Sequence, residues 1–151
     1  MTALNDILTT HDRKKFAVTH GIKMHIRLQR VIIDGDRTCG DPELVSLIRQ
    51  NPSLLQFFAK NSQTEVSIAG VINTRFISRR IDRLIVNHRN KTIAILDYKT
   101  DIDCDAFRDK YVAQLREYAT LLHAIYPDYK ITAHILWTHD FSLENIPIKP
   151  L

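Results

Sequence analysis

The sequence Ile-Ala-Ile-Leu-Asp-Tyr-Lys-Thr at residues 93–100 limits the fold more than any other stretch of the chain. Its apolar, β-branched beginning is typical of a strand that lies in a core. Alternate side chains of a strand share a face, so this strand is predicted to have two different faces. One face carries Ile93, Ile95, Asp97 and Lys99, and the other carries Ala94, Leu96 and Tyr98. The isoleucines would hold their face against a core and place a carboxylate and an ammonium about 7 Å further along, at the rim of the sheet.

The pair of Asp97 and Lys99 has two interpretations. In the first, it is an exposed ion pair at the end of an ordinary strand, because Asp-x-Lys is a short and common sequence. In the second, Asp97 holds a hard metal ion and Lys99 orients or deprotonates a water molecule. Other motifs of the sequence distinguish these two interpretations.

The composition favours one globular domain. The chain has 151 residues, of which 44% are hydrophobic and 25% are charged, and this is enough for a core of its own. No apolar run approaches the roughly 20 residues that span a bilayer. The first residues also lack the basic and apolar regions of a secretory signal. We therefore expect a cytoplasmic protein that does not bind membranes.

The sequence also limits the cofactors and partners. Cys39 and Cys104 are the only cysteines and form no C-x-x-C, so no iron–sulfur cluster is expected. No G-x-x-x-x-G-K-[ST] is present, which argues against an ATP-driven motor. The formal net charge is +4, and five arginines fall in one stretch, at Arg75, Arg79, Arg80, Arg83 and Arg89. This cluster indicates either a polyanionic partner or a solvated strand face.

The N-terminal part of the chain is predicted to be helical. Residues 10–32 read as one helix with Thr10 as its cap. Its inward stripe at helical spacing comprises Phe16, Val18, Ile22, His25, Leu28 and Ile32. His25 on this stripe is either a hydrogen-bonded core residue or a metal ligand. Residues 34–41 are predicted to be a loop, and two helices that begin at prolines follow, at 42–49 and 52–60.

The remainder is predicted to form a sheet and one long helix. Strands are expected at 65–69, 71–86, 92–99 and 130–137, a polar turn at 88–91, and a helix at 104–125. Residues 138–151 read as a loose or latched tail. These elements predict a single α/β domain over residues 1–151, with its core at about 10–137 and helices against both faces of the sheet.

Asp82 is a second unusual acid. It lies within the apolar strand Ile81-Asp82-Arg83-Leu84-Ile85-Val86. Burial of a carboxylate is costly unless the carboxylate is paired or binds a metal. The predicted hairpin makes the strands of Asp82 and Asp97 neighbours, so both acids are expected near Lys99.

These motifs, in this order, closely resemble the PD-(D/E)XK nuclease superfamily. Within it they resemble the RecB/AddA branch, the C-terminal nuclease domain of bacterial helicase–nucleases. The matching elements are Ile-Asp-Arg-Leu at 81–84, Asp-Tyr-Lys-Thr at 97–100 and Gln-x-x-x-Tyr at 114–118. His25 is similar to the metal-binding histidine of this branch. The resemblance covers roughly residues 19–137 and implies a restriction-endonuclease-like core, with a central mixed β-sheet flanked by helices.

The resemblance implies a role for each matching residue. Asp82 and Asp97 would coordinate Mg²⁺ or Mn²⁺, which suits the two carboxylates. His25 and the backbone carbonyl of Tyr98 would complete the protein ligands. Lys99 would position or activate the attacking water.

Further residues are assigned around this centre. Gln114 and Tyr118 would support the site and lie near DNA. Glu65 matches an acid that precedes the site in many members, and is otherwise a surface residue of a strand. The basic stretch would follow the DNA phosphates without reading bases, through Arg79, Arg80 and Arg83.

The chain differs from the family in three respects. Arg79 stands where many relatives have a glycine, the cysteines of the iron–sulfur members are missing, and no helicase is attached. RecB-type domains normally receive a strand from a motor. This chain would therefore find its own substrate or use a helicase as a partner.

The expected activity is Mg²⁺- or Mn²⁺-dependent hydrolysis of phosphodiester bonds in single- or double-stranded DNA. Such an enzyme would serve DNA repair, recombination or degradation. One alternative is a catalytically silent DNA-binding or assembly module of a helicase–nuclease complex. Another is a ribonuclease or a structure-specific nuclease such as a junction resolvase. The sequence does not distinguish exonuclease from endonuclease action.

Overall fold

The computed structural model describes the backbone of residues 2–149 and the side chains of residues 13–149. The elements follow one another as α1 (Thr2–Gln29), β1 (Ile32–Asp34), β2 (Arg37–Cys39), α2 (Pro42–Arg49), α3 (Pro52–Leu55), η1 (Gln56–Phe58), β3 (Gln63–Ile72), β4 (Arg75–Asn87), β5 (Thr92–Lys99), α4 (Cys104–Ile125), β6 (Lys130–Trp137) and β7 (Ser142–Ile146). None of the helices in residues 2–149 combines the length and the apolar character that crossing a bilayer requires.

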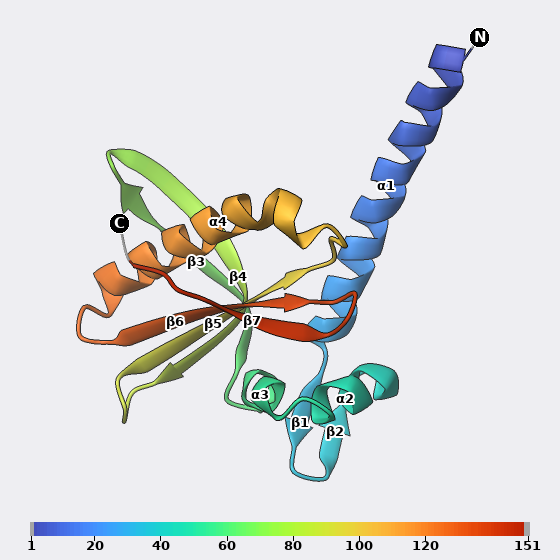
Figure 1. Ribbon diagram of the computed structural model, residues 1–151. Helices are drawn as coiled ribbons and strands as arrows, with labels where there is room; N and C mark the ends of the chain where they lie inside the picture. Colours follow the sequence, from blue (N-terminus) through green and yellow to red (C-terminus); the bar gives the residue numbers. More distant parts are fainter. Residues whose placement is uncertain (1, 150–151) are drawn as a thin grey trace.

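One mixed sheet forms the centre of the molecule (Figure 1). Its strand order is β3-β4-β5-β6-β7, and all neighbours are antiparallel except β5 and β6, which are parallel. A parallel pair needs a crossover connection, and α4 provides it. The predicted α/β class, with a central mixed sheet flanked by helices, is therefore confirmed.

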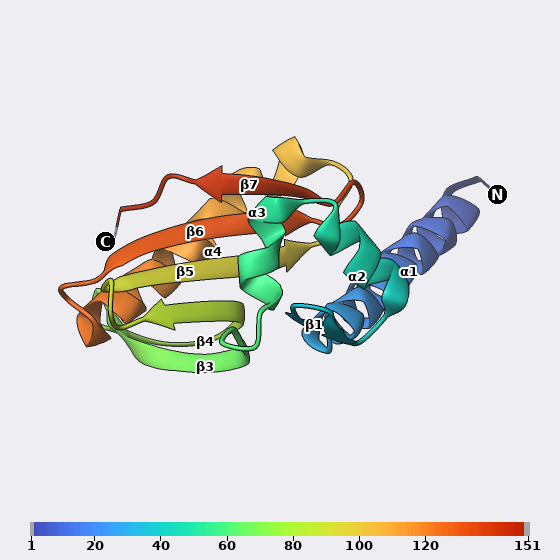
Figure 2. The ribbon, with the colours of Figure 1, turned by 90° about the horizontal axis from the view of Figure 1, so that it is seen from below.

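Helices cover both faces of this sheet (Figure 2). On one face, Ile93 and Ile95 of β5 belong to a core that includes Leu115 of α4. On the other face, Leu96 and Tyr98 belong to a second core, to which the end of α1, α2, α3 and η1 contribute. The predicted alternation of side chains along β5 is thus confirmed.

Two glycines allow helices to approach the sheet closely. A Cβ at Gly70 of β3 would lie 2.8 Å from Leu121 Cδ2 of α4, and one at Gly21 of α1 would lie 3.2 Å from Thr100 Oγ1. A larger residue would force the Leu121 side chain to move at Gly70, and the Thr100 side chain to give way by a few tenths of an ångström at Gly21. Gly21 therefore permits α1 to pass close to the end of β5.

The sheet divides into two arms at Asp82, a point that we call the fork. Residues 75–81 of β4 pair only with β3, and Ile85–Asn87 pair only with β5. Asp82 is absent from both ladders, and Glu65, which lies opposite it on β3, has a positive φ of 53°. Beyond the fork, the β3–β4 hairpin separates from β5 and β6 (Figure 1).

The first half of α1 extends beyond the sheet (Figure 1), and all side chains at residues 13–20 are exposed. The predicted inward stripe is therefore only partly correct. Leu28 is buried and His25 half-buried, but the outer members Phe16, Val18 and Ile22 are exposed. Ile32 is also exposed and lies in β1, after the end of α1. Thr10 lies inside α1 and not at its start, and its side chain falls outside the described residues.

Several other boundaries were predicted correctly, and a few were wrong. The helices at 42–49 and 104–125 and the strands at 92–99 and 130–137 are confirmed. The predicted helix at 10–32 ends earlier, at Gln29, and the β1–β2 hairpin begins at Ile32 and occupies most of the predicted loop at 34–41. The predicted helix at 52–60 is a short α3 followed by η1. The predicted strand at 71–86 is interrupted by a turn at Asn73 and Thr74. The tail is not loose throughout, because β7 pairs with β6.

Candidate active site

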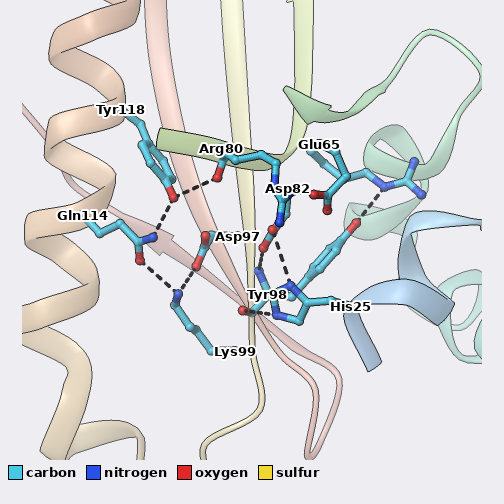
Figure 3. Close-up of polar contacts among 10 residues, drawn as sticks. His25, Glu65, Arg80, Asp82, Asp97, Tyr98, Lys99, Gln114 and Tyr118 are labelled. Atoms are coloured by element: carbon cyan, nitrogen blue, oxygen red, sulfur yellow. Dashed lines mark hydrogen bonds and ion pairs between the residues drawn. The ribbon is translucent and has the colours of Figure 1, made fainter. Parts of the chain in front are cut away.

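The carboxylates of Asp82 and Asp97 are both buried at the fork (Figure 3), with residue exposures of 8% and 2%. The last β4–β5 pair joins Arg83 and Leu96, so Tyr98 lies beyond the ladder. Its N–H donates to Asp82 Oδ2 at 2.8 Å. The Asp82 side chain thus replaces a strand partner for Tyr98 and is fixed where the two arms separate.

His25 reaches the same point from α1. Its Nδ1 lies 3.5 Å from Asp82 Oδ1, and its Nε2 lies 3.2 Å from the carbonyl oxygen of Tyr98. The imidazole also stands edge-on against the Tyr98 ring, with 5.3 Å between the ring centroids. The side chain therefore lies with the acids and not in the apolar core, while its role as a metal ligand stays a prediction.

Lys99 points from the end of β5 toward α4 (Figure 3). Its Nζ lies 2.6 Å from Asp97 Oδ2 and donates to Gln114 Oε1 at 3.0 Å. Gln114 Nε2 in turn lies 2.6 Å from the Tyr118 hydroxyl, which donates to the Arg80 carbonyl at 3.1 Å. This chain of contacts joins α4 to β4 and fixes the ammonium beside Asp97.

Tyr111 of α4 forms another wall around Lys99. The ammonium lies 4.2 Å from the centroid of its ring, a cation–π contact. The Tyr111 hydroxyl also donates to Asp101 Oδ2. The position of Lys99 is thus set by an acid, an amide and an aromatic ring together.

The electrostatics of the fork reflect burial and close charges. Burial raises the pKa of Asp97 to about 6, although the Lys99 charge opposes the rise, and the Asp82 charge adds to it. Burial alone would lower the pKa of His25, but the hydrogen bond to Asp82 and the negative charges of Asp82 and Asp97 outweigh it, so the pKa is raised. Such shifted groups in a concave region are typical of functional sites.

Two cavities open beside the fork. One, of about 1000 Å³, lies next to α1 and is lined by His25 and Asp82 together with Glu65 and Arg80. The other, of about 510 Å³, lies next to α4 and is lined by residues that include Lys99 and Gln114, with Arg79, Lys110 and Glu117. The fork is therefore reachable from two sides.

The structure brings three further predicted residues to the edges of these cavities. Arg80 forms an ion pair with Glu65 at 2.6 Å, and Arg79 forms one with Glu117 at 2.8 Å. Glu65 lies opposite Asp82 but points to Arg80, so it is beside the acid pair and not part of it. Arg79 and Arg80 are on the surface, where phosphates could reach them.

The prediction that Arg83 contacts DNA is wrong. Arg83 is 1% exposed, and its guanidinium donates to carbonyl oxygens of the end of α1 and of η1. Its neighbour Leu84 belongs to the core beneath α4, whereas the Arg83 guanidinium lies over Phe58 of the second core, on the opposite face of the sheet. The sequence pattern alone does not distinguish it from the exposed arginines nearby.

The donor set at the fork suits Mg²⁺ or Mn²⁺. Carboxylate and carbonyl oxygens are ligands of both ions, and imidazole also suits Mn²⁺. Asp97 Oδ2 is fully enclosed, and its contact with Lys99 lacks the alignment of a hydrogen bond, so it keeps capacity for a cation. Within residues 13–149, no three His, Cys, Asp or Glu side chains by themselves group as a metal site. A site at the fork would therefore need the Tyr98 carbonyl as well.

Sequence reasoning missed two residues at the site. Neither Tyr111 nor Glu117 was assigned a role from the sequence. Both lie three positions from Gln114, on the same side of the helix, and this spacing is the signal that could have found them. Tyr111 and Glu117 therefore lie on the same helix surface as Gln114.

No family model matches the chain, and no curated protein matches it. Among solved structures, a crystal structure of SSO0001 is similar over 72% of this chain, with 22% identity and a TM-score of 0.43. The match spans 48% of that other chain, about half of its length.

Proposed function

We propose that this chain is a Mg²⁺- or Mn²⁺-dependent deoxyribonuclease of the RecB/AddA type, within the PD-(D/E)XK superfamily. One observation carries the proposal. His25, Asp82, Asp97 and Lys99 come from three different elements, and their side chains converge at the fork with the Tyr98 carbonyl. The motif order of the sequence and the mixed sheet both agree with this family.

The chemistry follows from these neighbours. When bound, a divalent cation would neutralise phosphate charge and supply an activated water. Asp82, Asp97, His25 and the Tyr98 carbonyl are the groups that would hold it. The carboxylates are already desolvated by the fold, so binding of a cation would relieve the unfavourable burial of negative charge.

Lys99 is the residue that would act on the attacking water. An ammonium has three N–H donors, and one of them goes to Gln114, while the charge is held beside Asp97. The side chain is only 14% exposed, so it is fixed and not a freely moving surface lysine. A donor that remains can orient the water and stabilise negative charge that develops on the phosphate.

The surroundings suit a polyanionic substrate. Arg80 lies at the cavity next to α1, and Arg79 and Lys110 lie at the cavity next to α4. These side chains could contact phosphates on either side of the bond that is cut. Arg79 and Arg80 are each held by an acid, which fixes their guanidinium groups.

The test is cleavage of supercoiled plasmid and of linear single- and double-stranded DNA, with Mg²⁺, Mn²⁺ or EDTA. Asp97→Asn and Lys99→Ala are each expected to lower the cleavage rate by at least about 100-fold, as loss of a catalytic group commonly does. Nicked or linear plasmid would identify an endonuclease.

Matched controls come from the opposite end of β5. Lys91 and Asp128 form an exposed ion pair at 3.9 Å, so Lys91→Ala and Asp128→Asn should cleave like the wild type. Cleavage that persists in EDTA, or that survives Lys99→Ala, would contradict the proposal. Binding of DNA without cleavage in any lane would favour the catalytically silent module instead.

A further inference from the structure

Arg83 is a buried arginine that connects four parts of the chain. Its Nε donates to the Tyr98 hydroxyl at 2.8 Å, and its Nη1 donates to the Phe57 carbonyl at 3.1 Å. Its Nη2 reaches three main-chain carbonyls at the end of α1: Leu28 at 2.8 Å, Gln29 at 3.3 Å and Val31 at 2.7 Å. The Phe58 ring covers the guanidinium, 4.3 Å from its centroid. One side chain thus holds α1, η1 and β5 to β4.

These partners explain how the charge is tolerated in the interior. A buried cation is costly unless its donors are satisfied. Within residues 13–149, Arg83 has oxygens of carbonyls and a hydroxyl as its partners and forms no ion pair with an acid. The last carbonyls of a helix lack partners within the helix and carry partial negative charge. Arg83 therefore acts as a cap that locks the C-terminal end of α1.

This lock lies next to the candidate metal ligands. His25 is three residues before Leu28, so it belongs to the last turns of α1 that Arg83 holds. The side chains at 13–20 of α1 are exposed, so the helix is held to the body mainly near its end. The Tyr98 hydroxyl bonds to Arg83, while the carbonyl of the same residue faces His25.

We propose that Arg83 is a positioning residue for the metal site. Arg83 holds the end of α1 and the Tyr98 ring of β5 against β4. It thereby sets the placement of His25 relative to Asp82 and the Tyr98 carbonyl. The role in metal binding rests on the proposed function, whereas the placement of His25 does not. Lysine could supply the charge, but it lacks the planar fork that reaches Tyr98 and α1 together.

The experiment compares wild type, Arg83→Lys and the control Arg49→Lys, all as full-length protein. Arg49 also donates to a backbone carbonyl, that of Gly35, and neither of these residues lines the cavity beside His25. The first measurement is the nitrogen NMR spectrum of the His25 ring in EDTA, assigned with His25→Gln. Arg83→Lys is expected to shift these signals, and Arg49→Lys is expected to leave them unchanged. Unchanged signals in a folded Arg83→Lys protein would overturn the proposal.

The second measurement is a Mn²⁺ titration by calorimetry. Arg83→Lys is expected to weaken Mn²⁺ binding about 10- to 100-fold, as loss of a residue that orients a ligand does. In the His25→Gln background, the same change should weaken binding by less than about twofold, because its effect passes through His25. An equal loss in both backgrounds would indicate general destabilisation and overturn the proposal.

Two further outcomes of these experiments are interpreted differently. If the wild type binds no Mn²⁺, the metal site and the proposed function fail, while the His25 spectrum still decides whether Arg83 positions the ring. If Arg83→Lys does not fold, Tyr98→Phe replaces it, because this variant removes only the hydroxyl that accepts from Arg83. It should shift the His25 signals in the same direction, and an unchanged spectrum would overturn the proposal.

Discussion

At the scale of single residues, the buried carboxylate of Asp97 is the point where stability and the proposed function conflict. Its nearest partner is Lys99, and Asp82 adds a second negative charge close by. Holding such charges out of water destabilises the folded chain unless a cation joins them. Residues of this kind are expected to be replaceable with a gain in stability and a loss of activity.

In EDTA, Asp97→Asn is expected to raise the free energy of unfolding at pH 8. The pKa of Asp97 is about 6 in the folded chain and about 3.9 in the unfolded chain. The stabilising contribution of this carboxyl is therefore fully present below pH 4 and is lost as the pH rises through 6. The amide stays neutral. The gain should therefore be at most about 3 kcal/mol at pH 8 and vanish near pH 4. Denaturant unfolding at both pH values checks this, and a gain that is equal at both would contradict it.

Tyr111 gives a second prediction at this scale. Its ring contributes a cation–π contact to Lys99, worth roughly 1 kcal/mol or more in a desolvated position. Tyr111→Leu is therefore expected to lower the cleavage rate about 5- to 10-fold, because the ammonium is less well held. Tyr111→Phe keeps the ring and should retain most of the rate. Equal losses in both variants would instead point to the hydroxyl and its bond to Asp101.

Single residues also show where sequence reasoning reaches its limit. Asp82, Asp97 and Lys99 were identified because acids and bases within apolar strands are unusual. Arg83 was assigned to the wrong environment, because its sequence neighbours are arginines that lie on the surface. Its burial depends on the end of α1 and on η1, which are distant in sequence and supply the carbonyl partners.

At the scale of elements, strong periodicity and clear end signals gave correct boundaries. Pro42 indicated the start of α2, and the structure adds two side-chain caps that were not predicted, Asp41 for α2 and Asp103 for α4. The turn at residues 73–74 was missed because Asn73 and Thr74 adopt positive φ without a glycine to indicate it. β7 was missed because its pairing depends on β6 and not on its own sequence.

His134 of β6 provides a prediction about pH. Burial lowers its pKa, and its ring packs against Phe57 while Nδ1 lies 3.3 Å from the Ile95 carbonyl. Because the folded pKa is below the unfolded value of about 6.5, its contribution to stability is present above pH 6.5 and lost as the pH falls through the folded pKa. His134→Gln should therefore lose less stability than the wild type between pH 7.5 and pH 5. Unfolding curves in EDTA at both pH values measure this loss of stability. An identical loss in the variant and the wild type would exclude His134 as the titrating group.

At the scale of the whole molecule, the fork depends on contacts that no local sequence pattern contains. The sequence predicted that the strands of Asp82 and Asp97 are neighbours, and the register places these residues just beyond the last pair of β4 and β5. It did not predict that the arms separate there, nor that cavities open next to both α1 and α4. These features arise from the docking of two helices on opposite sides of one strand end.

This arrangement leads to a prediction about how DNA lies on the molecule. If phosphates occupy the cavity next to α4, Lys110 at its edge should contribute about one released counterion to binding. In EDTA, Lys110→Ala is then expected to reduce the slope of log K against log salt by about 1, for every DNA sequence alike. Lys91→Ala, in the turn before β5, should keep the wild-type slope. Fluorescence anisotropy from 50 to 200 mM salt measures both slopes. A reduced slope for Lys91→Ala and an unchanged slope for Lys110→Ala would place the DNA at the opposite end of the sheet, away from Lys99, and would count against cleavage at the fork.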